Sequence, residues 1–175
     1  MRIAFFLRIC RAPLGGLQAG TMTDTATIDL SDEAATCRLG AGLAALIRPG
    51  DVLALWSDLG GGKTTLARAL IQALLGGDEE VPSPTFTLVQ TYDAPQAIIW
   101  HFDLYRLERP EDVTELAFDE ALTDGICLIE WPERLGKLLP ARRLDITLAP
   151  GAGPESRRAI LTSHHQWDGR IGELA

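Results

Sequence analysis

Apolar residues occur along the chain in two patterns, short unbroken runs and positions spaced three or four residues apart. The unbroken runs at residues 51–56 and 125–130 predict strands buried on both faces of a sheet. Leu39, Leu43 and Leu46 follow helical spacing and predict an amphipathic helix. The first half of the chain should form an edge strand at 25–30, a helix with Ser31 as its N-cap that ends at Pro49-Gly50, a strand at 51–56 and a helix at about 64–75. A hairpin of strands 86–92 and 97–104 and a helix at 110–122 should follow. The chain should then form a strand at 125–130 and a closing hairpin of strands 143–148 and 158–162.

This order of elements predicts an α/β fold. We expect a single three-layer domain whose central, mostly parallel sheet carries antiparallel hairpin additions. At 175 residues the chain has the length of one domain with one continuous core. We expect this domain at residues 23–165, an extension at residues 1–22 and a C-terminal tail at residues 166–175.

The first 21 residues differ in charge from the rest of the chain. They carry Arg2, Arg8 and Arg11 and no acidic residue. A secretory signal needs about 7–15 apolar residues, and here the run from Ile3 to Leu7 ends at Arg8. Two interpretations remain open: a natural start at Met22 that leaves an upstream extension, or a transit-like segment.

The overall charge limits which partners the chain binds directly. The net charge is −8, with 24 acidic residues against 16 lysines and arginines, so the chain lacks a basic surface for a phosphate backbone. If the protein serves a nucleic acid, we expect a partner to hold that nucleic acid. The sequence lacks the roughly 20 apolar residues that span a membrane. Its three cysteines form no CxxC pair, which favours the reducing cytoplasm.

The strongest chemical signal is the glycine-rich segment between the strand at 51–56 and the helix at 64–75. Glycines let the backbone curl around a phosphate so that its amides face the oxygen atoms. We expect Lys63 to reach the β- and γ-phosphates of ATP and Thr64 to bind Mg²⁺. The residues expected to contact the nucleotide here are Ser57, Asp58, Leu59, Gly60, Gly61, Gly62, Lys63, Thr64 and Thr65.

One position departs from the strict pattern G-x-x-x-x-G-K-[ST], because Ser57 stands where that pattern has glycine. If position 57 requires a positive φ, serine costs about 1–2 kcal/mol there. We therefore expect nucleotide binding to be weakened by up to about tenfold but not abolished.

Two acidic residues end apolar strands and are candidates for catalysis. Asp103 follows the apolar run at 98–102, and Glu130 follows the run at 126–129. An acid at the end of a buried strand is the arrangement that supports Mg²⁺ in P-loop proteins. A single strand-end acid is more often a turn residue, but two of them beside a phosphate loop favour a catalytic role.

Four motifs together resemble the TsaE (YjeE) family of bacterial P-loop ATPases. The motifs are Ser57-Asp-Leu-Gly-Gly-Gly-Lys-Thr-Thr65, Pro82-Ser-Pro-Thr-Phe-Thr-Leu-Val89, His101-Phe-Asp-Leu-Tyr-Arg106 and Ile129-Glu-Trp-Pro132. The resemblance spans about residues 29–163, and the family usually has glycine at position 57 and alanine at position 61. It implies an ATPase of tRNA threonylcarbamoyladenosine formation, whose turnover resets the complex of TsaB and TsaD. The tRNA would then be held by those partners, in agreement with the acidic charge.

The resemblance also implies roles for individual residues. Thr64 and Glu130 would bind Mg²⁺, and Lys63, Asp103 and Glu130 would form the catalytic set. His101 is more often a structural residue and is left out of that set. Further nucleotide contacts are implied for Asp32, Ser83, Thr85, Trp131 and Arg158. The alternative for Asp32 and Arg158 is a solvated surface charge, and for Trp131 a place in the core.

Two other functions remain open at this stage. A small-molecule kinase on the same fold is the main alternative, although such enzymes usually have an arginine-rich lid that this sequence lacks. A nucleotide-gated binding module with negligible hydrolysis of its own is the second alternative, and it merges with the ATPase if a partner completes the active site.

Overall fold

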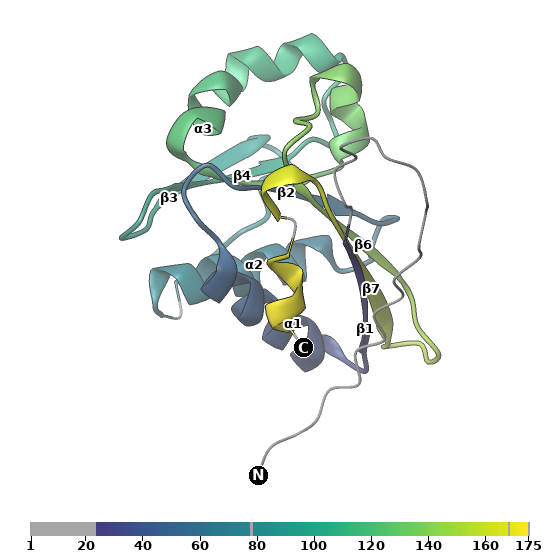
Figure 1. Cartoon of the computed structure of the whole chain (residues 1–175). Helices are drawn as coiled ribbons and strands as arrows, with labels where there is room; N and C mark the ends of the chain where they lie inside the picture. Colours follow the sequence, from purple (N-terminus) through teal and green to yellow (C-terminus); the bar gives the residue numbers. More distant parts are fainter. Residues whose placement is uncertain (1–23, 78, 168, 175) are drawn as a thin grey trace, which may run out of the picture.

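A seven-stranded mixed sheet organises the computed structural model, which describes residues 24–77, 79–167 and 169–174 (Figure 1). The strand order is β1-β7-β6-β2-β5-β4-β3. The strands are β1 (Thr25–Leu30), β2 (Val52–Trp56), β3 (Val89–Asp93), β4 (Ile98–Asp103), β5 (Ile126–Glu130), β6 (Leu144–Pro150) and β7 (Arg157–Ser163). The four central strands β6, β2, β5 and β4 run parallel, whereas β3, β7 and β1 join the sheet in antiparallel pairs. The α/β fold with a parallel centre and antiparallel hairpins is therefore confirmed.

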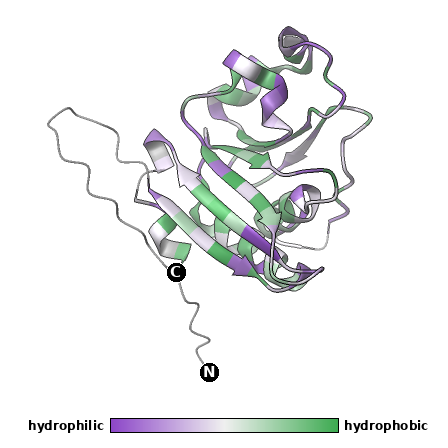
Figure 2. Cartoon of the chain, turned by 90° about the vertical axis from the view of Figure 1, so that its right-hand side faces the viewer, coloured by the Kyte–Doolittle hydropathy of each residue, from purple (hydrophilic) through white to green (hydrophobic). Residues whose placement is uncertain are grey.

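Helices cover both faces of this sheet and make the fold three-layered (Figure 1). On one face lie α1 (Glu33–Leu46) and α2 (Lys63–Leu75), which pack side by side. The opposite face carries α3 (Phe118–Asp124) together with two 3₁₀ helices, η1 (Pro110–Leu116) and η2 (Pro132–Leu138). Each face has its own apolar cluster, and the strands between them carry long apolar stretches (green in Figure 2). Residues 52–55 of β2 are all buried, as expected of a strand between two layers.

Three expected element boundaries are wrong, and the first is the N-cap of α1. Asp32, not Ser31, caps this helix, because its extended backbone places the carboxylate 2.7 Å from the amide of Ala35. Ser31 contributes by donating a hydrogen bond to that carboxylate over 3.0 Å.

The other two corrections come from residues with a left-handed backbone. The strand expected from residue 86 begins only at Val89, because the amide of Leu88 bonds to the carbonyl of Pro84 and Leu88 has a φ of 64°. The helix expected at residues 110–122 is broken at Ala117, whose φ of 55° separates η1 from α3. A helical pattern in the sequence does not reveal such a break.

The C-terminal residues contact the domain. Trp167, in η3 (His165–Trp167), and Ile171, in η4 (Ile171–Leu174), are buried in the apolar cluster beside α1 and α2. Arg170, which lies between these two residues in the sequence, forms an ion pair with Asp51 over 2.7 Å. These residues belong to the stretch expected to be a tail, and the extension expected at residues 1–22 lies outside the described residues. In the described part of the chain, none of the helices has the length and apolar character needed to cross a membrane.

Candidate nucleotide-binding site

The loop between β2 and α2 has the backbone of an anion-binding site. Gly60 has a φ of 74° and Gly62 a φ of 101°, a region that glycine adopts without strain. Gly62 is the N-cap of α2 and offers no side-chain oxygen to its first amides. Those amides and the positive end of the helix dipole are therefore directed at the space in front of the loop, where an anion would bind.

Ser57 does not have the strained backbone that the sequence pattern suggested. Among the described residues, the non-glycine residues with positive φ are Leu88, Ala117, Trp131 and His165. Ser57 therefore has an ordinary φ, and the cost of 1–2 kcal/mol expected for a left-handed serine does not arise here.

Lys63 is held deep in this loop by several contacts. Only 5% of its surface is exposed, and its Nζ donates to the carbonyls of Ser57 at 2.8 Å and Asp58 at 3.2 Å and to Oγ of Ser57 at 3.0 Å. The ring of Trp131 lies 3.7 Å from the same Nζ, at cation–π distance. Burial lowers the pKa of Lys63, and the nearby carboxylates, foremost Glu130, act against this shift.

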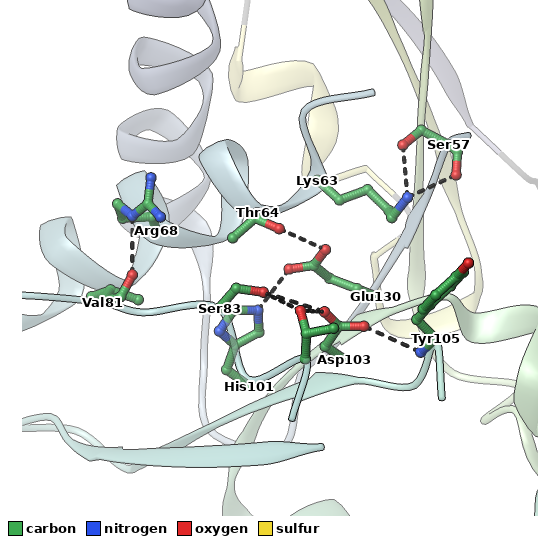
Figure 3. Close-up of polar contacts among 11 residues, drawn as sticks. Ser57, Lys63, Thr64, Arg68, Val81, Ser83, His101, Asp103, Tyr105 and Glu130 are labelled. Atoms are coloured by element: carbon green, nitrogen blue, oxygen red, sulfur yellow. Dashed lines mark hydrogen bonds and ion pairs between the residues drawn. The ribbon is translucent and has the colours of Figure 1, made fainter. Parts of the chain in front are cut away.

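Glu130, the last residue of β5, links this strand to α2, the helix that follows the loop (Figure 3). Its Oε2 accepts a hydrogen bond of 3.0 Å from the hydroxyl of Thr64, at the start of α2. Its Oε1 lies 2.9 Å from Nε2 of His101, a fully buried residue of β4. Both oxygens of the buried carboxylate are therefore satisfied, as burial of a charge requires.

Asp103 forms a second network at the end of β4, beside Glu130 in the sheet register (Figure 3). Its Oδ2 accepts hydrogen bonds from the hydroxyls of Thr85 at 2.7 Å and Ser83 at 3.3 Å. Its Oδ1 accepts from the amide of Tyr105 at 3.2 Å. The segment that carries the two hydroxyls is itself tied to α2, because Arg68 donates to the carbonyl of Val81 over 3.0 Å.

These groups line one cavity of about 310 Å³. Its lining consists of Leu59, Gly60, Gly61, Gly62, Lys63, Thr64, Thr65, Ser83, Thr85, Asp103, Tyr105, Glu130 and Trp131. A larger cavity of about 590 Å³ beside β3 includes none of the expected site residues.

Four of the expected nucleotide contacts do not line this cavity. Ser57 and Asp58 still contact Lys63 within the loop, whereas Asp32 and Arg158 belong to other parts of the fold. Asp32 caps α1, and hydrogen bonds from the amide of Ala35 and from Ser31 lower its pKa. Arg158 on β7 pairs with Asp29 of β1 over 2.9 Å, and both side chains are largely exposed. In the structure both residues act locally, and a nucleotide contact for either remains a prediction.

Two residues of the site were not expected from the sequence. His101 contacts Glu130, and the ring of Tyr105 packs against Trp131 with a centroid distance of 4.9 Å. A signal for His101 existed, because residues 101 and 103 point to the same face of a strand. Trp131 has a φ of 59°, a strained conformation that is often found at functional sites.

A buried strand, a glycine loop, a lysine and threonine at the start of the next helix and strand-end acids define a P-loop protein. The model of a family described as threonylcarbamoyl adenosine biosynthesis protein TsaE matches residues 30–160. The chain therefore belongs to the TsaE family of tRNA threonylcarbamoyladenosine biosynthesis proteins.

Relatives in several bacteria cover most of the chain. The TsaE protein of Rickettsia conorii is 39% identical over 137 residues, which is 78% of each protein. The TsaE protein of Bacillus subtilis is 38% identical over 121 residues, 69% of this chain and 74% of that protein. The crystal structure of Bacillus subtilis YdiB matches 89% of this chain and 96% of its own, with a TM-score of 0.70 and 27% identity.

Proposed function

We propose that this chain binds ATP with Mg²⁺ on the loop from Ser57 to Thr65 and hydrolyses it as an accessory protein of tRNA threonylcarbamoyladenosine formation. Its turnover resets a complex of TsaB and TsaD in the cytoplasm, and those partners hold the tRNA. The observation that carries the proposal is the meeting of Lys63, Asp103 and Glu130 in one cavity, each at most 5% exposed. Buried charges of both signs in a cavity are typical of a catalytic site.

The residues at the loop fit a magnesium ion. Mg²⁺ prefers hard oxygen ligands and takes one or two from the protein beside phosphates and waters. The hydroxyl of Thr64 and the carboxylate of Glu130, 3.0 Å apart, supply such oxygens and would hold it. When bound there, the ion would supply positive charge that offsets the charge of the nucleotide phosphates.

The second carboxylate has a different role in the proposal. In the proposal Asp103, which lines the cavity and accepts a hydrogen bond from Thr85, orients a water or takes its proton. Lys63 supplies positive charge to the phosphate oxygens, and the amides of the loop hold the phosphates in position.

Support for partner proteins comes from two exposed apolar side chains in segments that line the cavity. Leu59, in the phosphate loop, is 79% exposed, and Phe86, beside Thr85, is 82% exposed. Large exposed apolar side chains beside a functional site are typical of protein-binding surfaces. The net charge of −8 agrees with partners that carry the tRNA instead of this chain.

The proposal is tested by measuring ATP hydrolysis by the chain alone, by TsaB–TsaD alone and by the mixture. We expect a rate in the mixture well above the sum of the separate rates, and its loss with Lys63→Ala. The matched control is Lys137→Ala, since Lys63 and Lys137 are the two lysines of the sequence.

A mixture rate that equals the sum of the separate rates would contradict the accessory role. Transfer of the γ-phosphate to a metabolite, measured on a panel of small molecules, would instead support the kinase alternative.

A further inference from the structure

The ammonium group of Lys63 has a complete set of acceptors within the loop. It has three N–H donors. Three loop oxygens lie within 3.2 Å: the carbonyls of Ser57 and Asp58 and the hydroxyl of Ser57. A phosphate oxygen can therefore bond to Lys63 only if one of these three contacts is weakened or broken.

The contact that can be given up at least cost is the one to the hydroxyl of Ser57. The two carbonyls belong to the loop backbone, so they can withdraw only if the loop changes shape. The hydroxyl withdraws by rotation about a single side-chain bond. It also donates to the carbonyl of Asp58 over 3.0 Å, which holds it beside Lys63.

The side chain of Ser57 also limits which residue fits at position 61. A Cβ atom added to Gly61 would lie 2.5 Å from Cβ of Ser57 and 2.4 Å from its Oγ. Rotation of the hydroxyl cannot relieve the overlap with Cβ of Ser57, because the backbone fixes the position of that atom. Gly61, unlike Gly60 and Gly62, does not have a positive φ. The exclusion of a side chain at position 61 therefore comes mainly from contact with Ser57, and not from the backbone conformation.

We propose that Ser57 sets the nucleotide affinity of this loop, because its hydroxyl competes with phosphate for Lys63 and its Cβ makes glycine necessary at position 61. The proposal rests on nucleotide binding at this loop, as proposed above. It explains why serine at position 57 and glycine at position 61 are compatible in this loop.

The hydroxyl is tested with Ser57→Ala, which removes Oγ and keeps Cβ. Titration calorimetry with ADP should show binding about three- to tenfold tighter than in the native chain, the range of one net hydrogen bond. NMR of labelled lysine provides a second readout in the nucleotide-free protein. The Lys63 signals should shift in Ser57→Ala and those of Lys137 should not.

Failure of the native chain to bind ADP would contradict the proposed function itself. Native chain that binds ADP, with equal or weaker binding in Ser57→Ala, would overturn the role of the hydroxyl and leave the proposed function intact.

The pairing of positions 57 and 61 is tested with a double-mutant cycle. Gly61→Ala alone should weaken ADP binding by about tenfold or more, because Ser57 must move. The double variant Ser57→Gly with Gly61→Ala should recover most of this loss, although the carbonyl of Asp58 remains 3.0 Å from the new Cβ. Melting temperatures of all four proteins separate loss of binding from loss of fold. Native-like affinity in Gly61→Ala, or no recovery in the double variant, would overturn the claim that Ser57 makes glycine necessary at position 61.

Discussion

The hydroxyl of Thr64 donates a hydrogen bond of 3.0 Å to the carboxylate of Glu130, although 66 positions separate the two residues. Thr64 lies in the first turn of α2, and Glu130 is the last residue of β5. Because β2 and β5 are adjacent parallel strands, their carboxyl ends meet at the same edge of the sheet. The contact joins the phosphate loop to the strand-end acid at the place where we propose that Mg²⁺ binds.

Replacement of Glu130 by glutamine should raise the Mg²⁺ concentration needed for ATP hydrolysis by about tenfold. The amide keeps the shape of the side chain but removes the negative charge that offsets the metal. The measurement is the ATPase rate against Mg²⁺ concentration with TsaB–TsaD present. An unchanged Mg²⁺ midpoint would contradict the metal-binding role of Glu130.

Asp103→Asn should lower the turnover number by about a hundredfold or more while leaving the Mg²⁺ midpoint and ATP affinity nearly unchanged. This pattern is expected of a group that acts mainly in the transition state. Asp119→Asn, a change at an exposed position of α3, serves as the control. A shifted Mg²⁺ midpoint in Asp103→Asn, with none in Glu130→Gln, would mean that the roles of the two acids are exchanged.

His101 should act as a positioning residue for Glu130. Its Nε2 lies 2.9 Å from the carboxylate, so His101→Ala should shift the Mg²⁺ midpoint in the same direction as Glu130→Gln, by about three- to tenfold. His101→Gln, which can still place a donor near Oε1, should recover part of this shift. A loss of thermal stability without any change in Mg²⁺ dependence would assign His101 a purely structural role.

Asp145 on β6 should contribute to stability in a pH-dependent way. Burial opposes its ionisation, but hydrogen bonds from Arg143, Trp56 and His164 outweigh burial and lower its pKa. Since the folded pKa lies below the unfolded value of about 3.9, this stabilisation is present above that value and is lost as the pH falls through the folded pKa.

Asp145→Asn should therefore reduce the free energy of unfolding by about 1–3 kcal/mol at pH 7 and by progressively less as the pH falls below the unfolded pKa of Asp145. Thermal denaturation over a series of pH values from 7 downward measures the difference. Asp29→Asn is the matched control, because Asp29 is 78% exposed and its ion pair with Arg158 is open to solvent. A loss of unfolding free energy in Asp145→Asn that does not change with pH would contradict a stabilisation that depends on the ionised carboxylate.

Sequence patterns predicted the parallel centre of the sheet and the phosphate loop because both depend on local signals, apolar runs and glycines beside a lysine. They did not predict the contact of His101 with Glu130 or of Arg158 with Asp29. Both depend on which strands are neighbours in the sheet, and no local pattern records that order. The breaks at Leu88 and Ala117 were missed because both residues have a left-handed backbone that their side chains do not favour.

Nucleotide binding at the loop should depend most directly on Lys63. Titration of a fluorescent ATP analogue with Mg²⁺ against the native chain, Lys63→Ala and Lys137→Ala measures this. We expect the native chain and Lys137→Ala to bind equally well and Lys63→Ala to bind about tenfold to a hundredfold more weakly, since a charged donor to phosphate is lost. Equal affinities in all three proteins would contradict the assignment of the loop as the nucleotide site.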